Sequence, residues 1–230
     1  MAVLIVMTHG RAQYIEEAIE SLDEHLIGPF RRMVIHDDSN NPNYRKWLSS
    51  RFQEYEVITP LDAHGNPTGK VGCCAAYASA MQFVADTEDE DEWVFSTEED
   101  FVFNRVVNVY EMIEVMQQFP HLAQMVLRRQ PWGHEPKDGG FVAEWPLLYT
   151  DTDNGVYFWM EHQRNWSNNP NLYRKSMSRF KWPSEPGCEI SFAEQLMDYD
   201  ANTRFGLWGK RTDSPAVTHI GFDRAGGYGY

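Results

Sequence analysis

Three carboxylates stand together directly after an apolar run. Residues 93–101 read Trp-Val-Phe-Ser-Thr-Glu-Glu-Asp-Phe. In α/β proteins ligands collect at the carboxyl ends of buried strands, and carboxylates clustered there suit a divalent metal and its bound phosphates. Glu98, Glu99 and Asp100 therefore predict a site for a phosphorylated ligand. The alternative is a solvated acidic turn, because acidic residues are common nearby.

Two other predicted strands also end in polar residues. The strand at residues 3–8 leads into Thr8 and Arg11, and the strand at residues 32–36 leads into Asp37 and Asp38. Parallel strands end at the same edge of a sheet, so these side chains are expected to share one site with the acids at 98–100. Arg11 would contact phosphate there. Lys70, in a glycine-containing loop, is a second candidate; either cation could instead be an ordinary surface charge.

Apolar periodicity predicts the elements that position these residues. Strands at residues 3–8, 32–36, 55–59 and 93–96 alternate with helices at 14–26, 44–52, 74–85 and 106–119. This order is typical of an α/β fold with a largely parallel sheet flanked by helices. In the second half, strand-like pieces are expected at 124–128, 141–149 and 156–160. The chain has neither a dinucleotide-binding glycine motif nor a P-loop.

Length and composition predict a single domain that spans residues 1–230. It would have a ligand-binding half at 1–115 and an aromatic-rich half at 116–230. The net charge of −14 is uneven, because residues 1–115 hold 21 of the 34 acids and only 8 of the 20 bases. A phosphate near those acids needs a cation. The apolar run Ala2–Met7 is too short to cross a membrane, so we expect a soluble, cytoplasmic protein.

The chain has only three cysteines, an odd number. Cys73, Cys74 and Cys188 lack the spacing of zinc ligands. The adjacent pair lies in a run of small residues, which favours buried thiols in a reducing compartment. A structural role is expected for them.

These features together resemble the GT-A fold glycosyltransferases, within the broad family-2-like group. The resemblance implies a Rossmann-like, mostly parallel sheet with a smaller, aromatic-rich acceptor-side region. It also implies transfer of a sugar from a nucleotide-diphosphate donor, expected to be a UDP-sugar, to an acceptor hydroxyl, a hexosyltransferase-like activity. The match to this family is weakest between residues 120 and 185. The stretches that carry it are Val3–Arg11, Val34–Ser39, Trp93–Phe101, Cys188–Leu196 and Val217–Arg224.

The resemblance also assigns roles to the acids. Asp37-Asp38-Ser39 is similar to an Asp-Asp-x-Ser element whose acids face the base and ribose. The triplet at 98–100 resembles the Glu-Asp-Asp or Asp-x-Asp element that binds metal and diphosphate, and it departs from the commonest spelling at Glu99. Asp100 and Glu98 are then the expected ligands of Mn²⁺ or Mg²⁺, ions that suit an oxygen-rich site.

A histidine near the end of the chain resembles the C-terminal metal-binding histidine of many such enzymes. It is His219, in Thr-His-Ile-Gly. We expect it to bind the metal or a phosphate. A lone histidine is also commonly structural, and the sequence leaves both roles open.

An inverting transferase needs a base that takes the proton of the attacking hydroxyl. By resemblance Glu189, near the start of a predicted helix, is the first candidate and Glu194 the second. The alternative for Glu189 is an acid that favours the helix dipole. Inversion follows from the resemblance alone, and a retaining course would leave Glu189 to bind the acceptor.

One acid-free stretch is basic and aromatic. Between Glu161 and Glu185 it holds the bases Arg164, Arg174, Lys175, Arg179 and Lys181 among aromatic residues. Such a mixture is typical of nucleic-acid grooves, so the hydroxyl of a modified, hydroxymethylated DNA base is one possible acceptor. A glycan or a protein is the alternative acceptor, and the stretch could instead close over the donor diphosphate. A lipid acceptor is least favoured.

Two rival functions fit parts of this pattern. A sugar nucleotidyltransferase would need a glycine-rich basic loop after the first strand, which Thr8-His9-Gly10-Arg11 offers only weakly. A catalytically silent nucleotide- or glycan-binding module would bind the donor without turning it over.

Overall fold

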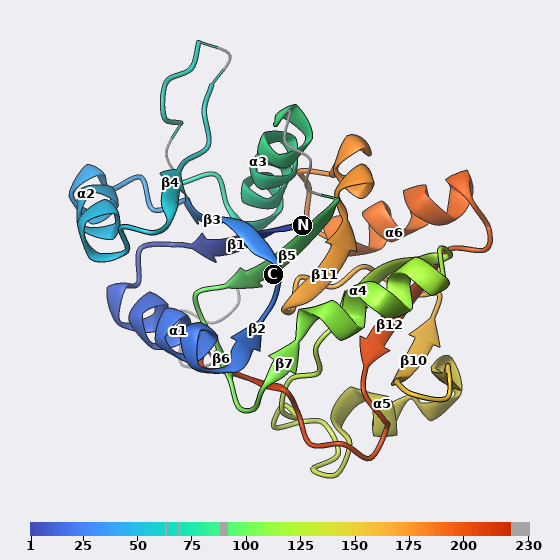
Figure 1. Cartoon of the computed structure of the whole chain (residues 1–230). Coiled ribbons are helices and arrows are strands. Elements are labelled where there is room, and N and C mark those ends of the chain that lie inside the picture. The colour runs from blue at the N-terminus through green and yellow to red at the C-terminus, as the bar shows by residue number, and fades with distance from the viewer. Residues whose placement is uncertain (63, 69, 88–91, 222–230) are drawn as a thin grey trace.

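A nine-stranded sheet forms the centre of this computed structural model, which describes residues 1–62, 64–68, 70–87 and 92–221 (Figure 1). The strand order is β4-β3-β1-β5-β11-β8-β12-β10-β9. The strands of this sheet are β1 (Ala2–Thr8), β3 (Phe30–Asp37), β4 (Glu56–Ile58), β5 (Trp93–Glu98), β8 (Leu122–Val126), β9 (Thr150–Asp153), β10 (Phe158–His162), β11 (Asn171–Arg174) and β12 (Arg204–Trp208).

Helices cover both faces of the sheet. They are α1 (Ala12–His25), α2 (Pro42–Arg51), α3 (Cys73–Asp86), α4 (Val109–Gln118), α5 (Gly140–Glu144) and α6 (Cys188–Tyr199), with 3₁₀ turns η1 (Pro146–Leu148) and η2 (Lys175–Arg179). Two small sheets pair β13 (Val217–His219) with β6 (Phe101–Phe103) and β2 (Leu26–Ile27) with β7 (Val107–Asn108). No described helix is long and apolar enough to cross a membrane.

The predicted α/β fold with a mostly parallel sheet is confirmed. Strands β4, β3, β1 and β5 pair in parallel, as do β8 and β12. Strands β11 and β10 run against their neighbours. Strands from both halves of the chain join in this one sheet. The four strands and four helices expected before residue 120 all form, with shifts of a few residues at their ends.

The core has two main layers because residues alternate along the strands. Val3, Ile5 and Met7 pack with the apolar faces of α3 and α6. Leu4 and Val6 point the other way, into the layer built with α1, α2 and α4. Helices α3 and α6 therefore lie on the same face of the sheet, as Figure 1 shows in teal and orange-red.

The register aligns the strand ends that carry the predicted site. Thr8 lies opposite Asp37, and Met7 lies opposite Glu98. Beyond Thr8 the chain turns at Gly10, whose φ of +95° is in a region that favours glycine and whose missing Cβ would lie 2.9 Å from Ser39 Cβ. The convergence of three strand ends is therefore as expected.

The second half departs from expectation at residues 141–149. The strands near 124–128 and 156–160 form as β8 and β10, but 141–149 folds as α5 and η1 instead of a strand. Gly139 and Gly140 both have positive φ and lead into the short helix, a turn that an apolar count does not reveal. The last resemblance stretch, Val217–Arg224, extends past the described residues at 222.

Candidate functional site

A buried ionic network lies at the ends of β1 and β5. Arg11 Nε donates to Glu99 Oε1 at 2.7 Å, and Arg11 Nη2 donates to Asp100 Oδ2 at 2.7 Å. Glu99 also accepts hydrogen bonds from the Thr8 hydroxyl and from the backbone N–H groups of His9 and Arg11. Glu99 and Asp100 are almost fully buried. The triplet is therefore not a solvated turn, and two of its acids hold Arg11 in place.

Asp100 is also paired with the predicted histidine. His219 Nε2 lies 3.3 Å from Asp100 Oδ2, because β13 pairs with β6 and sets His219 opposite Phe101. Gln130 fixes the His219 backbone from both sides, with bonds of 2.8 and 2.9 Å. Burial alone would raise the pKa of Asp100, but the hydrogen bonds and charges of His219 and Arg11 outweigh it and hold the pKa well below its ordinary value.

Asp100 and His219 fit a divalent metal whose other ligands come from a phosphorylated substrate. Mg²⁺ is commonly held by one or two protein groups plus phosphate oxygens and water. Two neighbouring ligands on octahedral bonds of about 2.1 Å lie about 3 Å apart, close to the 3.3 Å seen here. Within the described ranges, no three His, Cys, Asp or Glu side chains are grouped to hold a metal without a substrate.

The two acids after β3 have different surroundings. Asp37 accepts from the Ser39 N–H at 2.9 Å and from Arg45 Nε at 3.1 Å, so it orders the turn and α2. Asp38 accepts from the backbone N–H groups of residues 71 and 72 at 2.8 and 3.0 Å. Burial would raise the pKa of Asp38, but these bonds and His9 lower it below its ordinary value.

Two cavities adjoin this network and share Cys73 and Glu98 in their linings. The small cavity, of about 80 Å³, is lined by Thr8, His9, Arg11, Asp38 and Glu99 among others. The large cavity, of about 630 Å³, extends from Glu98 and His219 to the starts of α3 and α6. Arg11 Nη1 is buried and has no hydrogen-bond partner within the described residues. A donor group thus remains beside the small cavity.

Glu189 lines the large cavity from the first turn of α6. Its Oε1 accepts a hydrogen bond from the backbone N–H of Asn168, which fixes the carboxylate on the loop before β11. Burial raises the pKa of Glu189 above its ordinary value, and the bond from Asn168 offsets this only in part. A carboxylate with a raised pKa in a cavity suits proton transfer.

Two predicted site residues lie elsewhere. Glu194 is exposed on α6 and does not line either cavity. Lys70 is exposed next to the backbone groups that bind Asp38, and it also lies outside both linings. The structure brings together Thr8, Arg11, Asp38, Glu98, Glu99, Asp100 and His219, and it places Glu189 on the same large cavity as Glu98 and His219.

Two bases of the basic stretch, Arg174 and Lys175, lie away from this site. Arg174 stacks on Trp93 at 4.7 Å and donates to the Met116 carbonyl, and Lys175 donates to the Thr87 carbonyl. Trp93 begins β5, so about 16 Å of strand separates it from Glu98. The cause is the antiparallel direction of β11, which carries the chain to the opposite end of the sheet.

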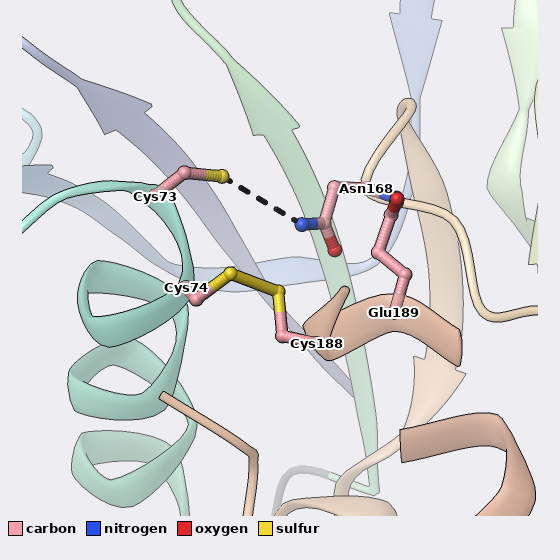
Figure 2. Close-up of a disulfide and its surroundings, with 5 residues drawn as sticks. All are labelled: Cys73, Cys74, Asn168, Cys188 and Glu189. Carbon is pink, nitrogen blue, oxygen red and sulfur yellow. Dashed lines mark hydrogen bonds between the residues drawn. A yellow bond between two sulfur atoms is a disulfide. The ribbon is translucent and has the colours of Figure 1, made fainter. Parts of the chain in front are cut away.

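The cysteines also differ from expectation. Cys74 and Cys188 form a disulfide between the first turns of α3 and α6, with Cα atoms 5.9 Å apart, and Cys73 is exposed (Figure 2). Buried free thiols were expected, but the sequence does not reveal that the two helices begin side by side. The disulfide lines the large cavity and immediately precedes Glu189. Asn168 Nδ2 points toward Cys73 Sγ, 3.9 Å away.

Reduction of this disulfide is expected to destabilise the fold substantially. The bond joins residues 114 positions apart, and closing a loop of that length restricts the unfolded chain by up to about 4 to 5 kcal/mol. Urea unfolding with and without a phosphine reductant measures the loss. The Cys73→Ser variant should respond to reductant as the parent does, whereas Cys74→Ser should not respond. An equal free energy of unfolding in both conditions would contradict the bond.

Three residues of the site were not predicted. His9 Nδ1 lies 3.8 Å from Asp38 Oδ2 and lines the small cavity. Asn168 and Trp132 line the large cavity. The available signals were the position of His9 next to Thr8 and the polar run Ser-Asn-Asn-Pro just before β11. Neither indicates which cavity a side chain reaches.

Solved structures with the same fold include glycosyltransferases. The chain is similar to residues 1–349 of S. aureus TarS in complex with UDP, at 13% identity and a TM-score of 0.57, over 94% of this chain and 59% of that one. It is also similar to the mannosyltransferase PcManGT from Pyrobaculum calidifontis in complex with GDP-Man and Mn²⁺, at 11% identity and a TM-score of 0.61, over 97% and 58%.

These likenesses concern the fold. The chain spans about three fifths of the length of those two structures. No protein-family model and no curated protein sequence matches it. The order of parallel strands, the flanking helices and the position of the acids after β5 agree with the predicted architecture. The chain has a GT-A glycosyltransferase fold.

Proposed function

We propose that this chain is a glycosyltransferase that moves a sugar from a nucleotide-diphosphate donor, a UDP-sugar in our hypothesis, to an acceptor hydroxyl. The observation that carries the proposal is the position of Arg11. Its guanidinium is held by Glu99 and Asp100 at the edge of the small cavity, with Nη1 left without a partner in the described chain. A guanidinium so placed suits a phosphate oxygen.

The donor would lie along the ends of the parallel strands. Asp38, at the small cavity, would contact the ribose or base, and Arg11 the diphosphate. Thr8 and Glu99 would act by positioning Arg11, since their side chains bond to each other and Glu99 bonds to the guanidinium. Asp37 would support Asp38 through the ordered turn, and Lys70 would approach the donor only from the solvent side. TarS and the mannosyltransferase were solved with UDP and GDP-Man respectively, which supports a nucleotide-linked donor.

Asp100 and His219, with Glu98 beside them, would hold Mn²⁺ or Mg²⁺. A divalent ion there would stabilise the negative charge of the departing diphosphate. Arg11 adds a fixed positive charge close to the same carboxylate, at 2.7 Å. Burial lowers the pKa of Arg11, but Glu99 and Asp100 raise it by more, so the guanidinium stays charged at any working pH.

Glu189 would take the proton from the acceptor hydroxyl as that oxygen attacks the anomeric carbon. Its carboxylate lines the cavity that also contains Glu98 and His219, which would place the acceptor next to the donor. Attack from the face opposite the leaving diphosphate gives inversion. The acceptor hydroxyl would belong to a glycan or to a modified DNA base.

A thermal-shift screen of nucleotide sugars with and without Mn²⁺ tests the donor. A ligand at about 100 times its Kd stabilises the native state by about 2.7 kcal/mol, which for a chain of this size raises the Tm by roughly 5 to 10 °C. We expect that increase with one nucleotide class and only with Mn²⁺. No shift with any nucleotide sugar would contradict the proposal.

Donor hydrolysis separates the rivals. A transferase releases the nucleoside diphosphate slowly when water replaces the acceptor, whereas a silent binding module shifts its Tm without any release. A sugar nucleotidyltransferase would instead form pyrophosphate from a nucleoside triphosphate and a sugar phosphate. Measurement of both products on the same protein distinguishes the three.

A further inference from the structure

Trp132 lines the large cavity on the loop that follows β8. One face of its indole lies over the Arg129 guanidinium, 3.8 Å from carbon Cζ to the ring centroid. Trp132 as a whole is half-buried, it is one of the residues that line the cavity, and the His134 ring lies 5.8 Å from its ring. An aromatic side chain that is backed by a cation and lines a cavity is a candidate stacking surface.

A buried ion pair holds Trp132 in place. Arg129 donates to both carboxylate oxygens of Glu135, at 2.8 and 3.0 Å, and both side chains are about nine-tenths buried. The backbone N–H of Trp132 donates to Glu135 Oε2 at 2.9 Å, and the backbone N–H of Glu135 donates to the Trp132 carbonyl at 2.9 Å. These bonds fix the backbone of Trp132, and the Arg129 guanidinium packs on its ring, so less entropy is lost when a ligand stacks there.

The same cavity presents side chains that bind hydroxyl groups. Asn168, Asn169, Ser184 and Glu189 all line it. Asn168 is more than nine-tenths buried, and its Oδ1 has no hydrogen-bond partner among the described residues. An unmet buried amide oxygen is costly unless a ligand hydrogen satisfies it. A hydroxyl donates such a hydrogen.

The charge of the cavity lining is unfavourable for a nucleic-acid acceptor. Among the described residues, no lysine or arginine lines the large cavity, whereas Glu98 and Glu189 do. Proteins hold nucleic acid chiefly through contacts from basic residues to phosphates. The basic residues Arg174 and Lys175 are at the other end of the sheet. The negative charge of these two side chains would repel a polyanion at this cavity but would not repel a neutral ligand.

We infer that the large cavity binds a neutral carbohydrate acceptor, with a pyranose ring stacked on Trp132 and a hydroxyl donating to Asn168. This inference rests on the proposed transferase function and names its acceptor class. It assigns Trp132 to acceptor binding and leaves the donor to Arg11 and its neighbours.

Fluorine NMR on the full chain labelled with 5-fluorotryptophan tests the stacking directly. The chain has eight tryptophans, and the Trp132→Phe variant identifies the Trp132 resonance. The probes are the methyl glycosides of glucose, galactose, mannose and N-acetylglucosamine, and a single-stranded oligonucleotide that contains 5-hydroxymethylcytosine, each added with UDP and Mn²⁺. We expect one glycoside to shift the Trp132 resonance saturably. A shift caused by the oligonucleotide alone, or by no probe, would overturn the inference.

Kinetics supply the second measurement. Trp132→Ala should lower the transfer rate to the glycoside that binds by 10-fold or more, Trp132→Phe should retain most of it, and Asn168→Ala should lower it several-fold. Donor hydrolysis is measured on the same variants, so that a loss of transfer larger than any loss of hydrolysis reports on the acceptor site. Trp145→Phe, an exposed tryptophan outside the cavity, is the matched control.

The outcomes separate this inference from the function on which it rests. If neither donor hydrolysis nor a thermal shift is observed, the transferase proposal itself is contradicted. Donor hydrolysis with an unmoved Trp132 resonance, or with equal transfer by Trp132→Ala and the parent, would remove only the carbohydrate subsite.

Discussion

Glu189→Gln is expected to lower sugar transfer by 100- to 10,000-fold while nucleotide-sugar affinity stays within 2-fold of the parent. A positioned general base contributes a factor of that size, and glutamine keeps the shape of the side chain but cannot take the proton. The Asn168 backbone N–H can still bond to the glutamine oxygen, so the loop should keep its position. Transfer rates and calorimetric donor affinities, measured on the same preparation, check both parts.

The pH profile gives the same prediction an independent readout. Only the deprotonated carboxylate can act as a base, and burial raises the pKa of Glu189 above its ordinary value. The parent's transfer rate should therefore fall as the pH decreases through that raised pKa, at a higher pH than for an ordinary glutamate. Glu189→Gln should lose this acid limb. The remaining activity would then be flat over the same pH range.

Two variants on the same helix complete the experiment. Asp198→Asn alters another exposed acid of α6 and should leave transfer unchanged. Glu194→Gln tests the second predicted base, and its exposed position outside the cavities predicts a change below 3-fold. Near-normal transfer by Glu189→Gln together with a large loss in Glu194→Gln would show that the base had been assigned to the wrong residue.

Asp100→Asn is expected to remove the effect of Mn²⁺ on donor binding, with a loss of at least 100-fold in affinity, or about 2.8 kcal/mol. An amide is a weak ligand for a hard cation, so the pair with His219 can no longer hold the ion. The substitution also removes a charge that Arg11 pairs with at 2.7 Å. Titration of UDP into the parent and the variant, with Mn²⁺ and with EDTA, measures the difference.

Two further variants test that result: His219→Ala removes the second proposed metal ligand, and Asp198→Asn is the control. His219→Ala should weaken the Mn²⁺-dependent affinity too, because His219 Nε2 is the partner group 3.3 Å from Asp100. Asp198→Asn should bind UDP as the parent does in both buffers. Equal UDP affinity of the parent and Asp100→Asn in Mn²⁺ would mean that the metal, if bound, lies elsewhere. Melting temperatures of all variants guard against a simple loss of folding.

The sequence predicted the donor half well because its signals are local. Alternating apolar residues in β1, β3 and β5 predict buried parallel strands, and parallel strands end at one edge. Thr8, Asp38 and Asp100 therefore meet as expected. The sequence could not tell which of these acids would hold Arg11. Glu99 follows the strand as closely as Asp100 does, yet its carboxylate accepts hydrogen bonds from the side chains of Thr8 and Arg11.

The acceptor half depends on long-range geometry that periodicity does not contain. The disulfide joins helices that begin 114 residues apart, and only their packing on one face of the sheet brings Cys74 to Cys188. The fold of residues 141–149 depends on positive φ angles at Gly139 and Gly140. The position of Arg174 and Lys175 could not be predicted, because the direction of β11 is a property of the whole sheet.

The reversed direction of β11 places the residues before and after it at opposite ends of the sheet, and we expect these two regions to evolve under different constraints. The residues just before β11, such as Asn168, reach the large cavity, and those just after it, such as Lys175, reach the far end of the sheet. Substitutions before the strand should therefore change which acceptors are used. Substitutions just after it, as at Lys175, are expected to alter charge and solubility without any change in chemistry. Homologues with different acceptors are then expected to diverge on one side of β11 independently of the other.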